Sequence, residues 1–305
     1  AGDTPIRRLR WTGWRCLQAE CRGRPPRGTG CGLLHGDLPR WRRIAEALGS
    51  GHPVAGWVDA EEASHHAGMP LDRGGLLVPS AGWLSPAELL GRRWDRVRDA
   101  GGRVAAPADP AEVVAAIAAA SPAAPLIDAT GGGHPALGLA WPVEPVRGQV
   151  SLVPPTEVTA AIRIIVCGRS ACLPVHAGRH LLASTYDHHD AGEDIREADH
   201  DRILRGLAEG RPAVARALAG ARPDGAWAGV RRTTPDRRPL IGAVPDRPGV
   251  LVSLAHGSRG VVGGAFGAAL LAAMACGEPW PAFIDDLDAV APTRRSAAAR
   301  AEARG

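Results

Sequence analysis

Two glycine-rich loops carry residues whose types and spacing could bind a ligand. The first covers residues 128–133, "DATGGG", and follows the apolar stretch "PLI". The second covers residues 256–260, "HGSRG", and lies between the apolar stretch "LVSLA" and a run of small residues that ends at Cys276. Ligands of open α/β sheets bind where the strands end in such loops. Both loops are therefore candidate ligand sites.

The second loop has the composition of a backbone binding site. Gly257 and Gly260 carry no side chain, so the chain can approach a ligand closely there. The amides of residues 258–261 are expected to point out of the start of the predicted helix, which favours negative charge or a carbonyl oxygen. The alternative is a tightly packed core helix whose preceding loop binds nothing.

In the first loop, Gly131, Gly133 and Ala136 satisfy the string G-x-G-x-x-A. That string is typical of dinucleotide sites only between a strand and a helix with an acid downstream. Pro135 interrupts the expected helix and the acid is missing, so a plain turn and a turn that lines a cofactor both stay open.

Arg231, in "GVRRTTPDRRPLIG", lies within a predicted strand. Most strand arginines are solvated at a sheet edge, whereas one buried by a ligand would clamp a carboxylate with two parallel hydrogen bonds. The histidines and acids of residues 187–201 lack a scaffold period, so they predict a solvated loop rather than a metal site, and His65 and His66 are interpreted in the same way. We assign no metal ligand.

The pattern of elements predicts a mixed α/β (α+β) fold. Helical spacing with caps occurs at 37–48, 61–70, 85–100, 109–121, 197–210 and 213–220, and antiparallel strands are expected between 146 and 187. We expect a substrate domain with an antiparallel sheet from 31–98 and 145–225. An incomplete Rossmann-like domain would comprise 99–144 and 226–293. Residues 1–30 are predicted to be disordered or a remnant, and 294–305 to be a tail.

Composition narrows the class of protein only slightly. The 305 residues carry a net charge of +4, and all 36 basic residues are arginines. The six cysteines form no C-x-x-C pair, which favours free thiols in a reducing compartment over a zinc cage. The apolar run 261–276 is short and glycine-rich for a membrane span. We therefore expect a cytoplasmic protein that does not enter membranes.

Five stretches, in this order, carry a resemblance to a known family: "AGWLSPAELL", "LIDATGGG", "PVRGQVSLVP", "GVRRTTPDRRPLIGAVPD" and "HGSRGVVGGAFGAALLAAMACGEP". Together they resemble the D-amino-acid-oxidase-type flavoproteins over residues 30–295. The match is closest to the FAD-dependent oxidoreductase half of bifunctional tRNA-modification enzymes. One departure stands out, because residues 1–60 contain no strand followed by G-x-G-x-x-G.

The resemblance implies FAD as the cofactor. It implies that residues 257–261 receive the flavin carbonyl, that Thr130, Gly131 and Gly132 line the cofactor, and that Arg231 holds the carboxylate of the substrate. The implied reaction moves hydride from an amine α-carbon to the flavin, and hydrolysis of the imine then strips a carboxymethyl group from a tRNA wobble uridine as glyoxylate. A methyltransferase partner would be a separate chain or missing.

Two alternatives stay open at this point. The same fold could belong to a small-molecule oxidase of D-amino acids or glycine. A chain without its dinucleotide-binding unit could also be a truncated remnant that binds no cofactor and catalyses nothing.

Overall fold

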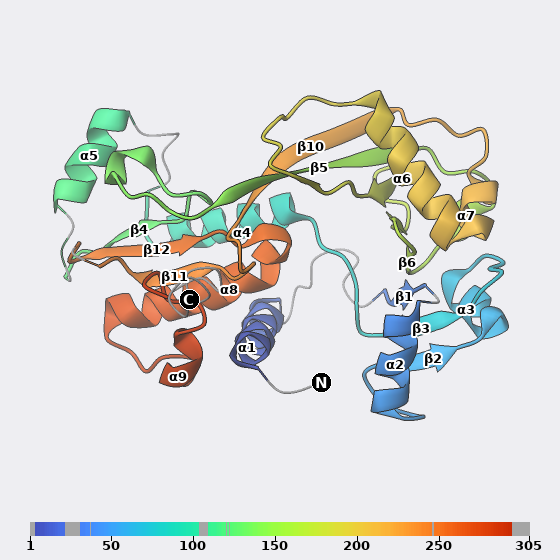
Figure 1. Cartoon of the computed structure of the whole chain (residues 1–305), viewed down its shortest axis with the longest axis horizontal. Helices are drawn as coiled ribbons and strands as arrows, with labels where there is room; N and C mark the ends of the chain where they lie inside the picture. Colours follow the sequence, from blue (N-terminus) through green and yellow to red (C-terminus); the bar gives the residue numbers. More distant parts are fainter. Residues whose placement is uncertain are drawn as a thin grey trace, which may run out of the picture.

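The computed structural model describes residues 4–21, 31–36, 38–103, 109–119, 121, 123–245 and 247–294. Two sheets organise these residues, and helices pack on both (Figure 1). The larger sheet has nine strands, in the order β10-β5-β8-β7-β6-β1-β3-β2 with β9 paired to β5. The smaller has three, in the order β11-β12-β4. The predicted mixed α/β fold is confirmed.

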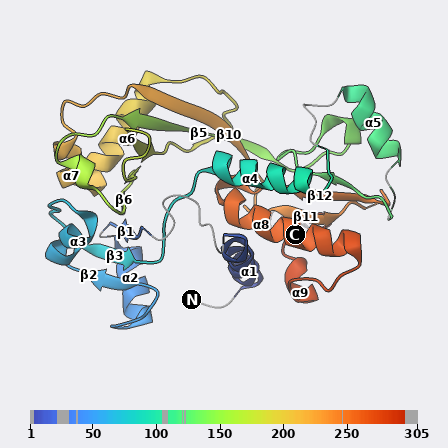
Figure 2. The same ribbon diagram turned by 180° about the vertical axis from the view of Figure 1, so that it is seen from behind.

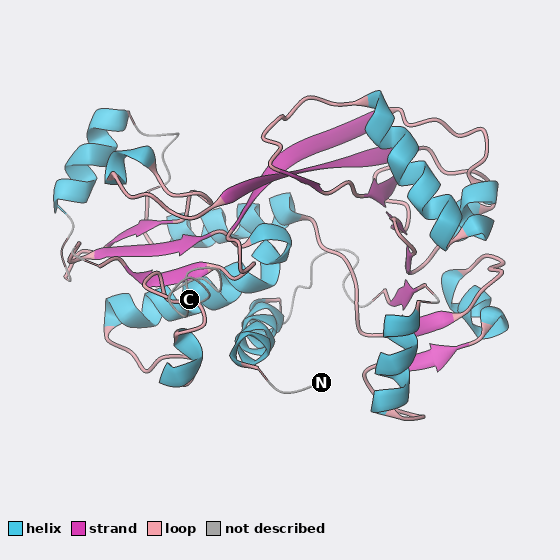
Figure 3. Ribbon diagram, in the orientation of Figure 1, coloured by secondary structure: helices cyan, strands magenta, loops and turns pink. Residues whose placement is uncertain are grey.

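The strands of the larger sheet come from both halves of the chain. They are β1 (Leu33–His35), β2 (Gly56–Val58), β3 (Gly75–Val78), β5 (Glu144–Val153), β6 (Ile165–Cys167), β7 (Ala171–Cys172), β8 (His180–Ala183), β9 (Asp187–His188) and β10 (Gly225–Thr233). Most of their pairings are antiparallel; β1 and β6 are parallel. Figure 3 shows that β5 and β10 run out of this sheet toward the smaller one.

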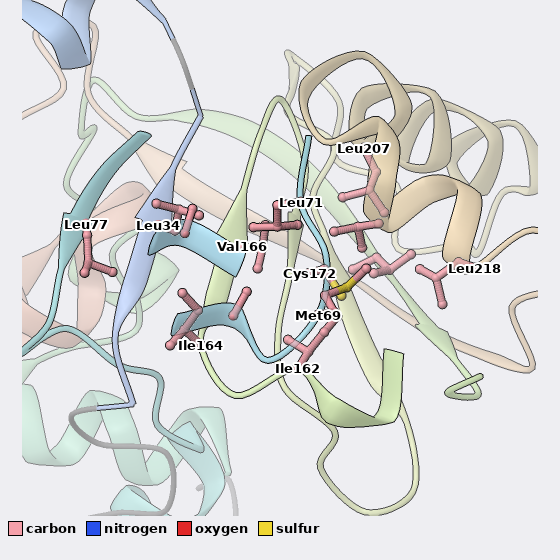
Figure 4. Packing of buried hydrophobic residues seen from close by; sticks show 14 of the residues in the cluster. Leu34, Met69, Leu71, Leu77, Ile162, Ile164, Val166, Cys172, Leu207 and Leu218 are labelled. Carbon is pink, nitrogen blue, oxygen red and sulfur yellow. The ribbon is translucent and has the colours of Figure 1, made fainter. Parts of the chain in front are cut away.

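One face of the larger sheet is covered by α6 (Glu197–Gly210) and α7 (Pro212–Ala217). Apolar side chains of strands and helices form the main core there (Figure 4), among them Leu34, Val166, Cys172, Leu207 and Leu218. Arg147 on β5 is fully buried under α6 and pairs with Asp199. Ser151 Oγ lies 2.7 Å from Nδ1 of His200. This face is closed by both apolar and polar contacts.

The smaller sheet positions the two glycine loops. Its strands are β4 (Leu126–Asp128), β11 (Leu240–Ala243) and β12 (Val250–Leu254). Strand β12 is parallel to β4 and antiparallel to β11. The long helix α8 (Gly260–Cys276) lies on this sheet and buries Phe266, Leu270 and Leu271 in a cluster shared with α1 and α9.

Helix α1 (Pro5–Glu20) packs against α8 at very short range. A Cβ atom added at Gly13 would lie 2.4 Å from the carbonyl oxygen of Val262, so only glycine fits there. Helix α4 (Pro86–Asp99; Figure 2) packs on the same two helices in a second cluster, in which Leu89 lies with Leu17 of α1 and Ala265 of α8. On α8 itself, Gly263 and Gly267 lie against the side chains of His256 and Ser253, whereas nothing lies within 4 Å of a Cβ atom added at Gly264.

The remaining helices are short and lie around the two sheets. They are α2 (Pro39–Leu48), α3 (Ala60–Ala67), α5 (Pro110–Ala119), α9 (Ile284–Leu287) and the 3₁₀ turns η1 (Pro135–Leu137), η2 (Thr159–Ala161) and η3 (Gly257–Arg259). The predicted caps of α4 and α5 are confirmed, because Ser85 Oγ accepts from Glu88 N–H and the Asp109 carboxylate accepts from Ala111 N–H. Asp37, predicted to cap α2, lies outside the described residues.

The structure departs from the sequence predictions at both ends of the chain. Residues 1–30 were expected to lack regular structure, yet 5–20 form α1, with Leu9, Gly13 and Leu17 buried at helical spacing. Arg294, assigned to the tail, is nearly buried and forms an ion pair with Asp236. Residues 22–30 and 295–305 lie outside the described part of the chain.

Two predicted domain boundaries also differ from the packing. Helix α4 was assigned with the larger sheet, but its buried Leu89 packs with α1 and α8. Strand β10 was assigned almost entirely with the smaller sheet, but it pairs with β5 over nine residue pairs. Both shifts come from long-range contacts; the division into two interleaved domains stays a prediction.

Helix α8 with the turn before it, Gly257–Cys276, is long and apolar enough to cross a membrane by length and composition. One third of this apolar stretch is buried within the protein. Helix α8 makes its contacts there with α1 and β12.

Candidate active site

The two glycine loops leave neighbouring strands at the same edge of the smaller sheet. Strands β4 and β12 run parallel, with Asp128 opposite Val252, so the chain leaves both strands in the same direction. Beyond the strands, the N–H of Ala255 donates a hydrogen bond of 2.8 Å to the carbonyl oxygen of Gly131. The structure thus brings together loops that are more than one hundred residues apart in the sequence.

Asp128, at the end of β4, holds the first loop in shape. Its Oδ1 accepts from the N–H of Thr130 at 3.0 Å and from the Thr130 hydroxyl at 2.7 Å. Its Oδ2 accepts from the N–H of His134 at 2.7 Å. Gly131 has a φ of +86°, in the region that favours glycine. Asp128 is a positioning residue that the sequence prediction did not single out.

The second loop presents the start of α8 to solvent. Ser258, Arg259, Gly260 and Val261 are exposed, and the side chain of the N-cap residue, Arg259, makes no capping hydrogen bond. The N–H of Arg259 donates to the carbonyl oxygen of His256 at 3.1 Å. The first turn contains no acid, so the positive end of the helix dipole is available to an acceptor group of a ligand.

His256 fixes the turn that precedes these amides. Its Nε2 lies 2.9 Å from Ser253 Oγ, and burial lowers the pKa of the imidazole to about 4. The histidine is therefore neutral at pH 7. It also forms an isolated antiparallel bridge with Thr233, the last residue of β10.

Arg231 lies two residues before Thr233 and points to the same face of β10. That face is opposite to the one that α6 covers, because Arg231 is in register with Val146 and not with Arg147. The guanidinium packs on the Cα of Gly148, where an added Cβ would lie only 2.1 Å from Nη1. Gly148 therefore provides the space for this arginine.

The guanidinium of Arg231 has lost water without gaining a partner. Its Nη1 is buried and has no hydrogen-bond partner among the described residues. Burial is the main cause that lowers the pKa of Arg231, and Tyr186 acts weakly in the opposite direction. A buried donor without a partner is costly unless a ligand supplies an acceptor.

Tyr186 stacks on this arginine, and the sequence prediction missed it. The guanidinium carbon lies 5.4 Å from the centre of the Tyr186 ring, which remains 41% exposed. It is the only tyrosine of the chain. An aromatic ring with a polar end, just after a predicted strand, was the available signal. Arg231 and Tyr186 together present two polar groups to solvent at one point.

Two cavities adjoin the start of α8. One, of about 480 Å³, lies between α1 and the loop and is lined by Trp11, Trp14, Ser258, Arg259 and Val261, among others. The other, of about 370 Å³, lies between α1 and residues 80–84 and also touches Val261 and Val262. The exposed amides therefore border open volume that side chains do not fill.

The prediction of a solvated loop for residues 187–201 is wrong at two positions. Asp199 and His200 are buried on α6 against β5 and are not part of a solvated loop. Among the described residues, no three His, Cys, Asp or Glu side chains are placed to hold a metal ion.

Comparison with known proteins gives one consistent result. A family model described as FAD dependent oxidoreductase (DAO) matches residues 3–274. The "tRNA 5-methylaminomethyl-2-thiouridine biosynthesis bifunctional protein MnmC" of Nitrosospira multiformis is 33% identical over an alignment 264 positions long, which covers 79% of this chain and 42% of the relative. The protein of the same name from Paraburkholderia phytofirmans is 31% identical over an alignment 328 positions long, gaps included, which covers 92% of this chain and 48% of the relative.

Solved structures show the same fold. Glycine oxidase of Geobacillus kaustophilus has a TM-score of 0.74 at 19% identity, covering 97% of this chain and 85% of that one. Iminodiacetate oxidase of Chelativorans sp. has a TM-score of 0.69 at 21% identity, covering 97% and 86%. The chain spans less than half the length of the two curated relatives above.

Proposed function

Because the chain belongs to the DAO family of FAD-dependent oxidoreductases, we propose that it oxidises an amine that carries a carboxylate. Arg231 is the observation that carries this proposal. Its half-buried guanidinium has a donor without a partner among the described residues and fits a carboxylate with two parallel hydrogen bonds. The next two residues of the strand lead to the loops, because Arg232 lies against Gly132 and Thr233 against Gly257.

The residues at the start of α8 fit the flavin part of FAD. The exposed amides of Ser258, Gly260 and Val261 would receive a carbonyl oxygen that gains negative charge, and the adjoining cavities offer volume. Thr130, Gly131 and Gly132 would line the other side. FAD, when bound, accepts the hydride that the amine gives up, and with it the two electrons of the oxidation.

Arg231 and Tyr186 would bind and orient the substrate. Arg231 and Thr233 are two positions apart in the strand, which corresponds to roughly 7 Å along β10. Thr233 touches Gly257, since an added Cβ there would lie 3.4 Å from Thr233 Oγ1. A carboxylate held by Arg231 would thus place its α-carbon between the arginine and the loop. Orientation of this kind supplies much of the rate of such reactions.

We further propose that the amine is part of tRNA. The names of the curated relatives support this substrate, and the cytoplasm would then be the location. The product would be an aminomethyl uridine, with glyoxylate released when water hydrolyses the imine. The second activity of the bifunctional relatives, expected to be methyl transfer, would be carried out elsewhere than in these residues.

The alternative substrate is a free small amino acid such as glycine, which presents the same carboxylate and amine to Arg231. The salt dependence of the reaction distinguishes the two candidate substrates. Binding of tRNA involves phosphate contacts and weakens steeply as salt rises, whereas a single amino acid responds weakly.

The test is an assay with purified protein and added FAD. One substrate is tRNA that carries 5-carboxymethylaminomethyluridine, and the other is glycine. We expect glyoxylate from the tRNA, with a rate that falls as salt increases. Turnover of glycine alone would support the second candidate, and no glyoxylate from either would refute the proposed function.

A further inference from the structure

Helix α2 and the strands next to it hold flat side chains in two stacks at one end of the larger sheet. The guanidinium carbon of Arg40 lies 4.5 Å from the centre of the Trp41 ring. The Trp41 ring also stacks on His35 of β1, with ring centres 3.7 Å apart. In the second stack, the guanidinium carbon of Arg42 lies 4.5 Å from the centre of the Trp57 ring of β2. These rings therefore orient two arginines of α2, which lies beside β2 and β3 (Figure 1).

The positive charge of α2 is not balanced within the helix. Arg40 and Arg43 are exposed and lie three residues apart, so they are neighbours on the helix surface. Among the described residues, neither of them forms a hydrogen bond or an ion pair. Glu46 is the only acid of α2, and the first turn contains none. Arg40 and Arg43 therefore present two positive charges side by side.

A guanidinium that is held by its face differs from one that is held in an ion pair. Arg202 on α6 donates to Asp187 at 2.8 Å, so its N–H groups are in use. Arg40 lies over Trp41 with the face of its plane, which leaves the N–H groups around the edge for another acceptor. A stacked side chain also loses less conformational freedom on binding. Arg40 is therefore oriented in advance for an acceptor with two oxygens.

We propose that Arg40, Trp41 and Arg43, called the α2 surface below, bind the phosphate backbone of tRNA. Phosphate oxygens accept two parallel hydrogen bonds from a guanidinium, and neighbouring arginines match neighbouring phosphates. Unpaired bases stack on aromatic rings and on guanidinium planes. An acidic protein segment supplies carboxylates but no flat bases, so the stacked planes favour RNA. The choice of tRNA as this RNA rests on the proposed function.

The α2 surface lies at the other end of the larger sheet from Arg231. Strands β10 and β2 end the strand order, and the seven spacings between them amount to roughly 34 Å along the sheet. A free amino acid bound at Arg231 does not reach that far, whereas a nucleic-acid duplex covers this length in about ten base pairs. The α2 surface would thus raise the affinity for a macromolecular substrate without touching its reacting group.

Fluorescence anisotropy with a labelled, unmodified tRNA transcript measures this binding without FAD and without turnover. We expect the double variant Arg40→Gln, Arg43→Gln to raise Kd about tenfold and to lower the slope of log Kd against log salt by about two. Arg40→Lys keeps the charge but loses the planar fork, so it should keep the slope and raise Kd about threefold.

The matched control removes the same charge elsewhere. Arg15→Gln with Arg222→Gln changes two exposed arginines, on α1 and before β10, and should alter Kd less than about twofold because charges away from the contact are screened. Circular dichroism checks that the variants fold. Arg43→Gln alone, outside the stack, carries the test should the double variant unfold.

Several results would overturn the α2 surface. They are no binding of the transcript, equal Kd and salt slope in the double variant and the control, and displacement of the transcript by polyglutamate as readily as by single-stranded RNA. Arg40→Lys binding like the unmodified protein would overturn the role of the stacked plane. Failure of the proposed function shows separately, as a protein that binds the transcript through the α2 surface but forms no glyoxylate from the modified tRNA.

Discussion

Two arginines on neighbouring strands of the larger sheet show how the protein uses its two faces. Arg147 on β5 is fully buried, pairs with Asp199, and also donates to Oε1 of Gln149 at 2.9 Å. Arg231 on β10 faces the other way, is only half-buried, and forms no ion pair with any described residue. Each arginine keeps one buried nitrogen without a hydrogen-bond partner among the described residues, Nε of Arg147 and Nη1 of Arg231. The difference lies in the charge, which an acid of the protein pairs on one side of the sheet and not on the other.

The difference separates stability from binding. A buried charge whose partner is in the protein contributes to the fold, and removing the partner leaves an uncompensated charge in a dry environment. A charge without a protein partner contributes little to stability but can bind an acceptor that arrives later. Mutations on the two sides should therefore affect different measurements.

The largest expected effect on stability is at the ion pair of Arg147 with Asp199. Asp199→Asn removes the charge that faces Arg147 and should lower the free energy of unfolding by about 3 kcal/mol. Urea denaturation measures this change. Arg231→Gln, measured in the same way, should change stability by less than about 1 kcal/mol. Equal losses in both variants would remove the proposed distinction between the two faces.

The largest expected effect on function is at Arg231. Arg231→Gln should raise KM for a carboxylate-bearing amine about 100-fold, because a charge-assisted contact of about 2–3 kcal/mol is lost. Flavin affinity should stay the same. Arg222→Gln, at an exposed position before β10, is the control. Normal turnover by the Arg231 variant would show that another residue holds the carboxylate.

A smaller effect should follow from moving Arg231 without changing it. Gly148→Ala places a methyl group where the guanidinium now lies, 2.1 Å from Nη1. We expect KM to rise about tenfold as the contact is weakened but not removed. Gly225→Ala on β10, whose nearest neighbour is a Leu152 side-chain atom at 3.3 Å, is the matched control. Equal KM values for the two variants in steady-state kinetics would refute the packing role of Gly148.

The smallest expected effect is that low pH weakens the packing of α1 on its neighbours. A hydrogen bond from Arg93 is the main cause that lowers the pKa of Glu20, and one from Arg8 does the same for Asp286. Depressed carboxyl pKa values stabilise the protein above about pH 4, the range of the unfolded groups, and this contribution is lost as pH falls further. Hydrogen exchange of α1 should therefore speed up in acid.

Glu20→Gln with Asp286→Asn supplies the control for that experiment. The double variant should exchange faster at neutral pH and show a weaker response of α1 to acid. The same acid response in the double variant and the unmodified protein would mean that other groups attach α1.

Local patterns were enough to predict the glycine loops and most helices. Ser85 and Glu88 mark the start of α4, and glycines after short apolar strands mark both loops, because these signals depend on neighbouring residues only. Helix α1 was missed since its buried stripe contains Gly13, which is unfavourable in a helix by itself. Its fit against the Val262 carbonyl exists only after α8 has packed.

The relation between Arg231 and its surroundings could not be predicted for a similar reason. Gly148 and Tyr186 reach the arginine through the pairing of β10 with β5 and the return of the chain after β8. Burial of Asp199 and His200 depends on α6 lying over β5. Each of these contacts joins segments that are distant in the sequence, so no local pattern records it.

The central claim is that the exposed amides at the start of α8, together with the first glycine loop, receive a flavin. Adding FAD to the purified protein, removing the excess by gel filtration and recording the visible spectrum tests it most directly. The account predicts retained flavin absorbance that a carboxylate-bearing amine bleaches in the absence of oxygen. A protein that stays colourless after FAD is added would contradict it.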